Sequence, residues 1–110
     1  MAEQLPPPFR LRLHPDRERL VVTPTGELDI ETADRLTAAM LEPLDNGFRH
    51  VVADLRGVTF IDSSGIRSLW EAHQRAERDG ARLSVIIGNG HVRRALALTG
   101  LLDRMWQLER

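Results

Sequence analysis

The sequence contains no cysteine, which excludes disulfide bonds, thiolate metal sites and a cysteine nucleophile. It has no apolar run approaching the roughly 20 residues that a membrane-spanning helix requires. Fifteen basic and sixteen acidic residues leave a net charge of −1, so there is no overall electrostatic attraction to nucleic acid. Residues 1–9 lack the basic start and apolar stretch of a signal peptide. We therefore expect a cytoplasmic protein that binds neither a membrane nor nucleic acid directly.

Lysine is missing as well, and all fifteen basic residues are arginine. Arginine pairs bidentately with carboxylates and phosphates, but codon bias in a GC-rich genome produces the same excess. Without lysine the chain cannot form a Gly-x-x-x-x-Gly-Lys phosphate loop. The four histidines include no pair at metal-ligand spacing, so neither a metal site nor a cofactor is predicted.

A chain of 110 residues has the size of one domain, and its composition of 42% hydrophobic and 28% charged residues is typical of a globular protein. Three consecutive prolines lie at residues 6–8. Because proline enters neither a helix interior nor a central strand, residues 1–8 are predicted to form a flexible tail and residues 9–110 the domain.

The hydrophobic pattern predicts strands alternating with helices in the order β-β-α-β-α-β-α-β, which is an α/β fold with a mixed sheet of about five strands. The predicted strands are residues 9–14, 20–23, 48–55, 83–87 and 104–108, and a further strong apolar segment is 58–61. The predicted helices are residues 32–44, 66–80 and 92–99. Pro24 next to the second strand requires an edge position or a bulge there.

Residues 60–65 combine an apolar strand end with Asp62, Ser63, Ser64 and Gly65 at the start of a predicted helix. One interpretation is a helix cap, since Asp and Ser accept hydrogen bonds from the first backbone N–H groups of a helix. The other is an anion or phosphorylation site, because those N–H groups and the helix dipole stabilise a phosphate. The residues alone leave both open.

Residues 51–55 followed by 58–65 resemble the signature of STAS domains, and more closely that of the small bacterial anti-sigma factor antagonists. Two further blocks agree with this family in order and spacing, residues 25–29 and residues 92–101. The resemblance extends over residues 9–108. Three blocks in register on a compatible pattern of strands and helices make it specific.

The resemblance implies a single STAS domain that acts as a protein–protein switch in transcription regulation. The unphosphorylated form would bind an anti-sigma factor that is also a serine kinase, and a sigma factor would be released. Phosphorylation of Ser63 would end the binding until a serine phosphatase restores the hydroxyl. The protein itself would need no cofactor, since ATP and its metal belong to the kinase.

Carried over by position, Asp29 and Asp62 would flank the phosphorylation site, and Ser64 would lie beside it as a capping hydroxyl. Gly65 and Arg67 complete the predicted environment of the site.

Three positions depart from the family pattern, and one of them is Pro24, just before the block at residues 25–29. Arg67 stands where a small residue is common, and it could pair with Asp62, contact an acidic partner, hold a phosphate or simply point into solvent. Trp70 replaces an aliphatic residue and could belong to the core edge or anchor a partner.

Two other functions compete with the switch. An enzyme with Ser63 as nucleophile is disfavoured, because Ile61 occupies the place of the first glycine in a Gly-x-Ser-x-Gly elbow. The alternative within the same fold is a subunit of a different signalling or lipid-transport assembly without control of a sigma factor.

Overall fold

The structure, a computed structural model, describes residues 8–108. The predicted Pro-rich tail therefore lies, except for Pro8, outside the described residues. The strands are β1 (Arg10–Asp16), β2 (Arg19–Leu28), β3 (His50–Asp54), β4 (Val58–Ile61), β5 (Arg82–Ile86) and β6 (Trp106–Gln107). The helices are α1 (Ala33–Asp45), α2 (Ser63–Arg78) and α3 (His91–Leu98).

The strands form one mixed sheet with the order β1-β2-β3-β5-β6, and β4 pairs with β2 outside this path. Only the β1–β2 pair is antiparallel; the other pairs are parallel. The predicted α/β fold with a mixed sheet is confirmed. The sheet has six strands within the described residues rather than about five, because residues 58–61 form a separate short strand.

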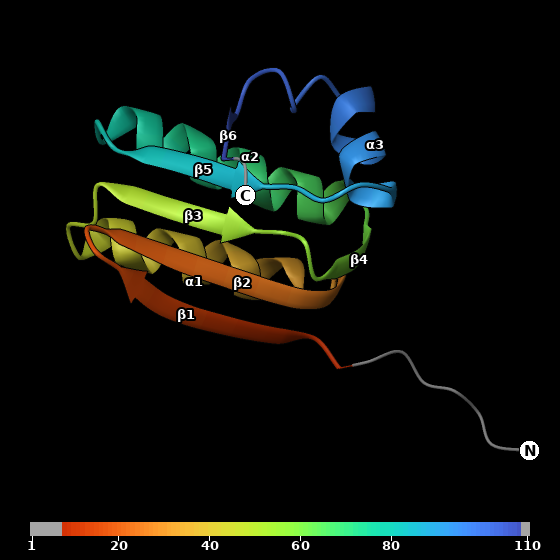
Figure 1. Ribbon diagram of the computed structural model, residues 1–110, viewed down its shortest axis with the longest axis horizontal. Coiled ribbons are helices and arrows are strands. Elements are labelled where there is room, and N and C mark those ends of the chain that lie inside the picture. The colour runs from red at the N-terminus through yellow and green to blue at the C-terminus, as the bar shows by residue number, and fades with distance from the viewer. Residues whose placement is uncertain (1–7, 109–110) are drawn as a thin grey trace, which may run out of the picture.

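Strand β2 changes its parallel partner along its length. Residues 19–22 pair with β3, and from Gly26 onward β2 pairs with β4 (Figure 1). Pro24 lies between these two paired segments, and the register shifts between Gly26 and Glu27. β2 is an inner strand, so Pro24 does not occupy the edge position that the sequence allowed. It lies in the part of β2 between the residues that pair with β3 and those that pair with β4, where no hydrogen bond to either strand is required.

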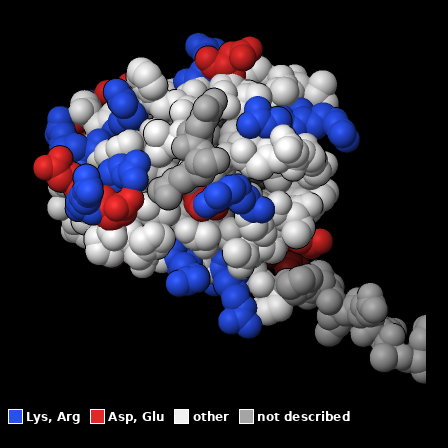
Figure 2. Space-filling view, viewed as in Figure 1, with Lys and Arg blue, Asp and Glu red and all other residues white. Residues whose placement is uncertain are grey.

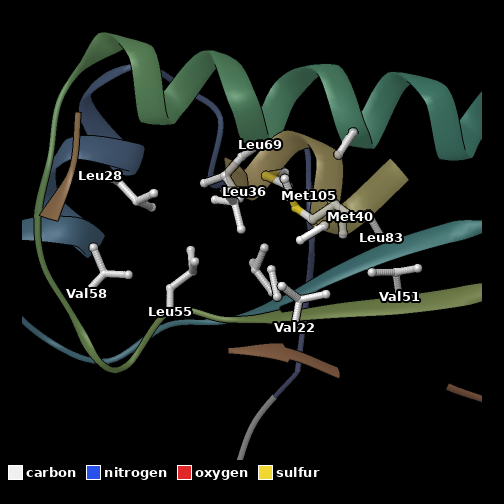
Figure 3. Close-up of a cluster of buried hydrophobic side chains, with 14 of the residues drawn as sticks. Val22, Leu28, Leu36, Met40, Val51, Leu55, Val58, Leu69, Leu83 and Met105 are labelled. Atoms are coloured by element: carbon white, nitrogen blue, oxygen red, sulfur yellow. The ribbon is translucent and has the colours of Figure 1, made fainter. Parts of the chain in front are cut away.

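Helices α1 and α2 pack side by side on one face of the sheet (Figure 1). Ala33, Leu36, Met40 and Leu44 fall three or four positions apart along α1, the spacing of one helix face, and all four are buried. Figure 3 shows how these helix side chains meet those of the sheet in one apolar layer. α3 lies apart from this pair, against β4 at the end of the sheet.

The opposite face of the sheet is not covered by α1 or α2 (Figure 1). Val21, Val52 and Ile86 form a small buried cluster with Leu108 there. Figure 2 shows that arginine side chains form several separate groups on this face, with carboxylates among those at the left end. No helix within residues 8–108 combines the length and the apolar character needed to cross a membrane.

His50 is a titratable group built into the sheet. Its Nε2 lies 2.8 Å from the hydroxyl of Ser84, which is fully buried. Partial burial, and then the charges of Arg19 and Arg82, lower the pKa of His50 below its ordinary value of 6.5. Protonation of His50 therefore favours the unfolded chain.

We expect the free energy of unfolding to decrease as the pH falls below about 6.5, because the unfolded chain then takes up a proton that the folded His50 resists. The variant His50→Gln keeps a polar group beside Ser84 but cannot take up this proton, so its free energy of unfolding should decrease less at low pH. Near pH 8, the free energy of unfolding should depend on pH in the same way in both proteins. Urea denaturation of both proteins at intervals from pH 5 to pH 8 measures it. An unchanged pH dependence in the variant would contradict the assignment.

Candidate functional site

The site lies where β2 and β4 end side by side. Leu28 and Ile61 are register partners at the ends of the two parallel strands, and the amide of Asp62 donates to the carbonyl of Leu28 at 3.1 Å. The next residues of the two strands are Asp29 and Asp62. The backbone therefore places Asp29 and Asp62, which the resemblance puts around the site, directly after the ends of neighbouring strands, although 33 positions separate them in the sequence.

Asp62 is the N-cap of α2. Its Oδ1 accepts the backbone N–H groups of Ser64 at 2.8 Å and Gly65 at 3.3 Å. The capping interpretation is thus confirmed for Asp62. The hydroxyl of Ser64 does not form the cap, because Ser64 is already the second residue of the helix and contributes its backbone N–H instead.

Asp29 is held by the turn that leads into α1. Its Oδ1 accepts the amide of Glu31 at 3.0 Å and lies 3.2 Å from the hydroxyl of Thr32. That hydroxyl accepts the amide of Asp29 and donates to the carbonyl of Glu27 at 2.7 Å. The Asp29 carboxylate is therefore fixed in position at the end of β2.

Ser63 is the first residue of α2 and is exposed. Its hydroxyl forms no hydrogen bond within residues 8–108. Ser63 lines an open groove of about 320 Å³ between the start of α2 and the segment that follows α3. The other residues that line it are Ile66, Arg67, Trp70, Thr99, Leu101 and Arg104. The Ser63 hydroxyl is thus accessible to another molecule, whereas the Asp62 carboxylate is occupied by the N–H groups of α2.

Arg67 and Trp70 take different places along this groove. Arg67 is exposed and forms no ion pair with Asp62 or with any other carboxylate of the described chain. Trp70 is half-buried and packs against the main core, which confirms the core-edge interpretation. Its ring also contributes to the groove wall, with the guanidinium of Arg104 centred 5.4 Å from the ring.

Gly65 allows α2 to begin close to the strands. A Cβ atom at this position would lie 2.7 Å from Cγ1 of Ile61 and 2.9 Å from Cβ of Leu28. Both distances are shorter than van der Waals contact, and Leu28 and Ile61 are themselves buried. Only glycine therefore fits between the first turn of α2 and the ends of β2 and β4.

Large apolar side chains are exposed on three segments that border the site. Ile30 follows Asp29 and is 80% exposed, Leu98 precedes the groove residue Thr99 and is 82% exposed, and Phe60 of β4 is 40% exposed. Phe60 stacks on His91 with ring centroids 5.3 Å apart. The sequence reading did not identify these as site residues. Ile30 between Asp29 and Glu31 was the detectable signal, because it lies outside the periodic pattern of both neighbouring elements.

The groups that hydrolytic or metal chemistry would need are not assembled around Ser63 in the described chain. Nε2 of His91 lies 3.2 Å from the carbonyl of Ile61, and no histidine of residues 8–108 is hydrogen-bonded to the Ser63 hydroxyl. Residues 8–108 also contain no cluster of three or more histidine or acidic side chains that could hold a metal ion. The local geometry offers an accessible hydroxyl at Ser63.

Known proteins are similar to this chain in sequence. The model of a family described as the STAS domain matches residues 10–109. The anti-sigma F factor antagonist of Paenibacillus polymyxa is 29% identical over 98 residues, which cover 88% of this chain and 84% of that protein.

Solved structures show the same fold. An anti-sigma factor antagonist from Mycobacterium paratuberculosis has a TM-score of 0.83 at 24% identity, with 91% of this chain and 85% of that chain covered. The anti-sigma factor antagonist SpoIIAA in its unphosphorylated form has a TM-score of 0.76 at 22% identity, with 94% and 88% covered. The Bacillus cell fate determinant SpoIIAA in its phosphorylated form has a TM-score of 0.71 at 21% identity, with 94% and 91% covered.

We expect Gly65→Ala to lower the free energy of unfolding by about 1–3 kcal/mol, because the added methyl group forces α2 away from the strands. Gly88→Ala is the matched control, since a Cβ there would meet only Cγ of Arg56 at 3.8 Å. Urea denaturation compares the two variants with the parent. Equal stability of the two variants would show that the close approach of α2 to the strands at Gly65 does not contribute to the free energy of unfolding.

Replacing Asp62→Ala should lower the free energy of unfolding by about 0.5–2 kcal/mol, because two backbone N–H groups of α2 lose their acceptor. Asp62→Asn keeps an acceptor oxygen and should retain most of that stability. The same denaturation measurement separates the capping role of Asp62 from the effect of its charge. If the alanine variant were as stable as the asparagine variant, the cap would not contribute.

Proposed function

Because the chain belongs to the STAS domain family, we propose that it is an anti-sigma factor antagonist whose activity is switched by phosphorylation of Ser63. The unphosphorylated form binds an anti-sigma factor that is also a serine kinase, so that a sigma factor is released. Phosphorylation by that kinase ends the interaction, and a serine phosphatase restores it. The exchange takes place in the cytoplasm and requires no catalysis by this chain. Relatives named as anti-sigma factor antagonists support the proposal.

The observation that carries the proposal is the accessibility of the Ser63 hydroxyl. It is exposed at the first residue of α2, has no hydrogen-bond partner in the described chain, and faces an open groove. A kinase can reach such a hydroxyl without unfolding any part of the domain. Ser64, the neighbouring hydroxyl, is half-buried and lies one residue further into the helix.

A phosphoryl group on Ser63 is compatible with the fold. The Asp62 carboxylate already accepts the N–H groups of Ser64 and Gly65, so the cap of α2 does not depend on the serine hydroxyl. The start of a helix also favours negative charge through its dipole. We therefore infer that phosphorylation leaves the domain folded and alters only its surface.

The same phosphoryl group changes that surface strongly for a partner. It adds about −1.5 to −2 charges at pH 7. These charges join the carboxylates of Asp29 and Asp62 at one edge of the sheet. A partner that covers the neutral hydroxyl and the exposed Ile30 would have to desolvate this charge, which costs several kcal/mol at an interface. A loss of about 3 kcal/mol already weakens binding more than a hundredfold.

We expect Ser63→Asp to weaken binding to the cognate anti-sigma factor at least about tenfold, corresponding to about 1.4 kcal/mol, while its melting temperature stays within a few degrees of the parent. Ser63→Ala should bind like the parent but accept no phosphate. Titration calorimetry measures binding, and mass spectrometry after incubation with the kinase and Mg-ATP locates the phosphate.

Ser64→Ala is the control for this experiment, since it should still be phosphorylated at residue 63. Equal affinity of the Ser63→Asp variant and the parent, or phosphate located only at another residue, would refute the proposed switch.

A further inference from the structure

Two arginines from different parts of the fold line the groove that Ser63 faces. Arg67 lies one helical turn after Ser63 on α2, and residues four positions apart lie on the same face of a helix. Arg104 comes from the segment between α3 and β6, lines the same groove and lies over the ring of Trp70 of α2. The hydroxyl and the two guanidinium groups therefore share one surface hollow, although 41 positions separate the first from the last.

Like most arginines of residues 8–108, these two have no carboxylate partner; ion pairs are formed there by Arg19, Arg56 and Arg75. Arg56 pairs with Asp54 at 2.8 Å, and Arg75 pairs with Asp79 at 2.9 Å and with Asp45. Arg67 forms no ion pair in the described chain, and the guanidinium of Arg104 lies over the ring of Trp70. Their positive charges are therefore available to an anion that enters the groove.

We propose that Arg67 and Arg104 form a binding site for the phosphoryl group of phosphorylated Ser63, an inference that rests on the proposed function. Guanidinium groups bind phosphate through paired N–H···O hydrogen bonds, so the chemistry of the two side chains suits a phosphomonoester dianion. Arg67 is placed to bind it directly across one turn of α2. Arg104 reaches it along the groove wall by leaving the face of Trp70.

This pairing gives Arg67 two alternative anionic ligands. When Ser63 is unmodified, Arg67 is exposed beside the hydroxyl and free to pair with a carboxylate of the partner kinase. When Ser63 carries a phosphate, the intramolecular anion is one helical turn away and outcompetes a carboxylate on another molecule. Phosphorylation thus removes a favourable contact as well as adding negative charge beside Asp29 and Asp62.

The pairing also connects phosphorylation to the C-terminal part of the chain. Arg104 lies one residue before Met105, which is buried in the main core, and two residues before β6. Because Met105 is held in the core, Arg104 engages the phosphate by turning its side chain away from the Trp70 ring, and the backbone of this segment stays in place.

The test uses the full chain with phosphoserine introduced at residue 63 during translation, so that no kinase is required. Phosphorus NMR over pH 4–8 gives the second pKa of the phosphate, which is about 6 for free phosphoserine. Arg67→Gln and Arg104→Gln are compared with Arg78→Gln, an exposed arginine on the same helix about 22 Å from Ser63. Asp29, Asp62 and His91 are present in every sample, so their effects cancel.

We expect Arg67→Gln to raise this pKa by about 0.5–1 unit and Arg104→Gln by a smaller amount, because an opposite charge within about 6 Å favours the dianion. Arg78→Gln should shift it by less than either. The Nε–Hε resonance of Arg67 should also move when the unmodified and phosphorylated chains are compared.

The site is refuted if Arg67→Gln and Arg104→Gln shift the pKa no more than Arg78→Gln does. A shift with Arg67→Gln alone would overturn the part assigned to Arg104. Binding of the anti-sigma factor to the same samples is measured separately. If the phosphorylated and unmodified chains bind it equally, the proposed switch fails whatever the pKa values show, so the two failures are distinguishable.

Discussion

The first turn of α2 rests directly on the ends of β2 and β4, and the candidate site depends on this contact. Gly65 lets the helix approach Leu28 and Ile61 more closely than any side chain would permit. Asp62 then caps the helix at the same point and fixes the direction in which it starts. As a result, Ser63 belongs to a rigid helix at the end of these strands and not to a loop. A hydroxyl held in this way can be modified without disturbing the core behind it.

The ends of β2 and β4 lie side by side because β2 changes its pairing partner along its length. The first half of β2 pairs with β3 and the second half with β4, so β4 is displaced from the main order of strands. The ends of β2 and β4 carry Asp29 and Asp62 to adjacent positions. The hydrogen bonds of the turn after β2 hold the Asp29 carboxylate in place, and the cap of α2 holds that of Asp62.

The groove beside Ser63 unites two distant segments with different chemistry. Arg67 and Trp70 belong to α2, and Thr99, Leu101 and Arg104 belong to the segment between α3 and β6. The half-buried ring of Trp70 links this surface to the core. Charge, apolar contact area and an accessible hydroxyl thus meet at one end of the domain, which suits a surface that recognises a protein partner and is altered by one covalent change.

The sequence by itself determined the α/β class, the helical spacing of the apolar residues in α1 and the motif around Ser63. These depend on local periodicity and helix-start chemistry, which act over a few residues. It could not determine that residues 58–61 form a separate strand beside β2, because strand pairing is a long-range choice between competing apolar segments. It also could not show that Ile30 and Phe60 are exposed, or that Arg104 faces the same groove as Arg67. Only the tertiary structure decided those features, since they depend on which distant segments pack together rather than on the preferences of any one of them.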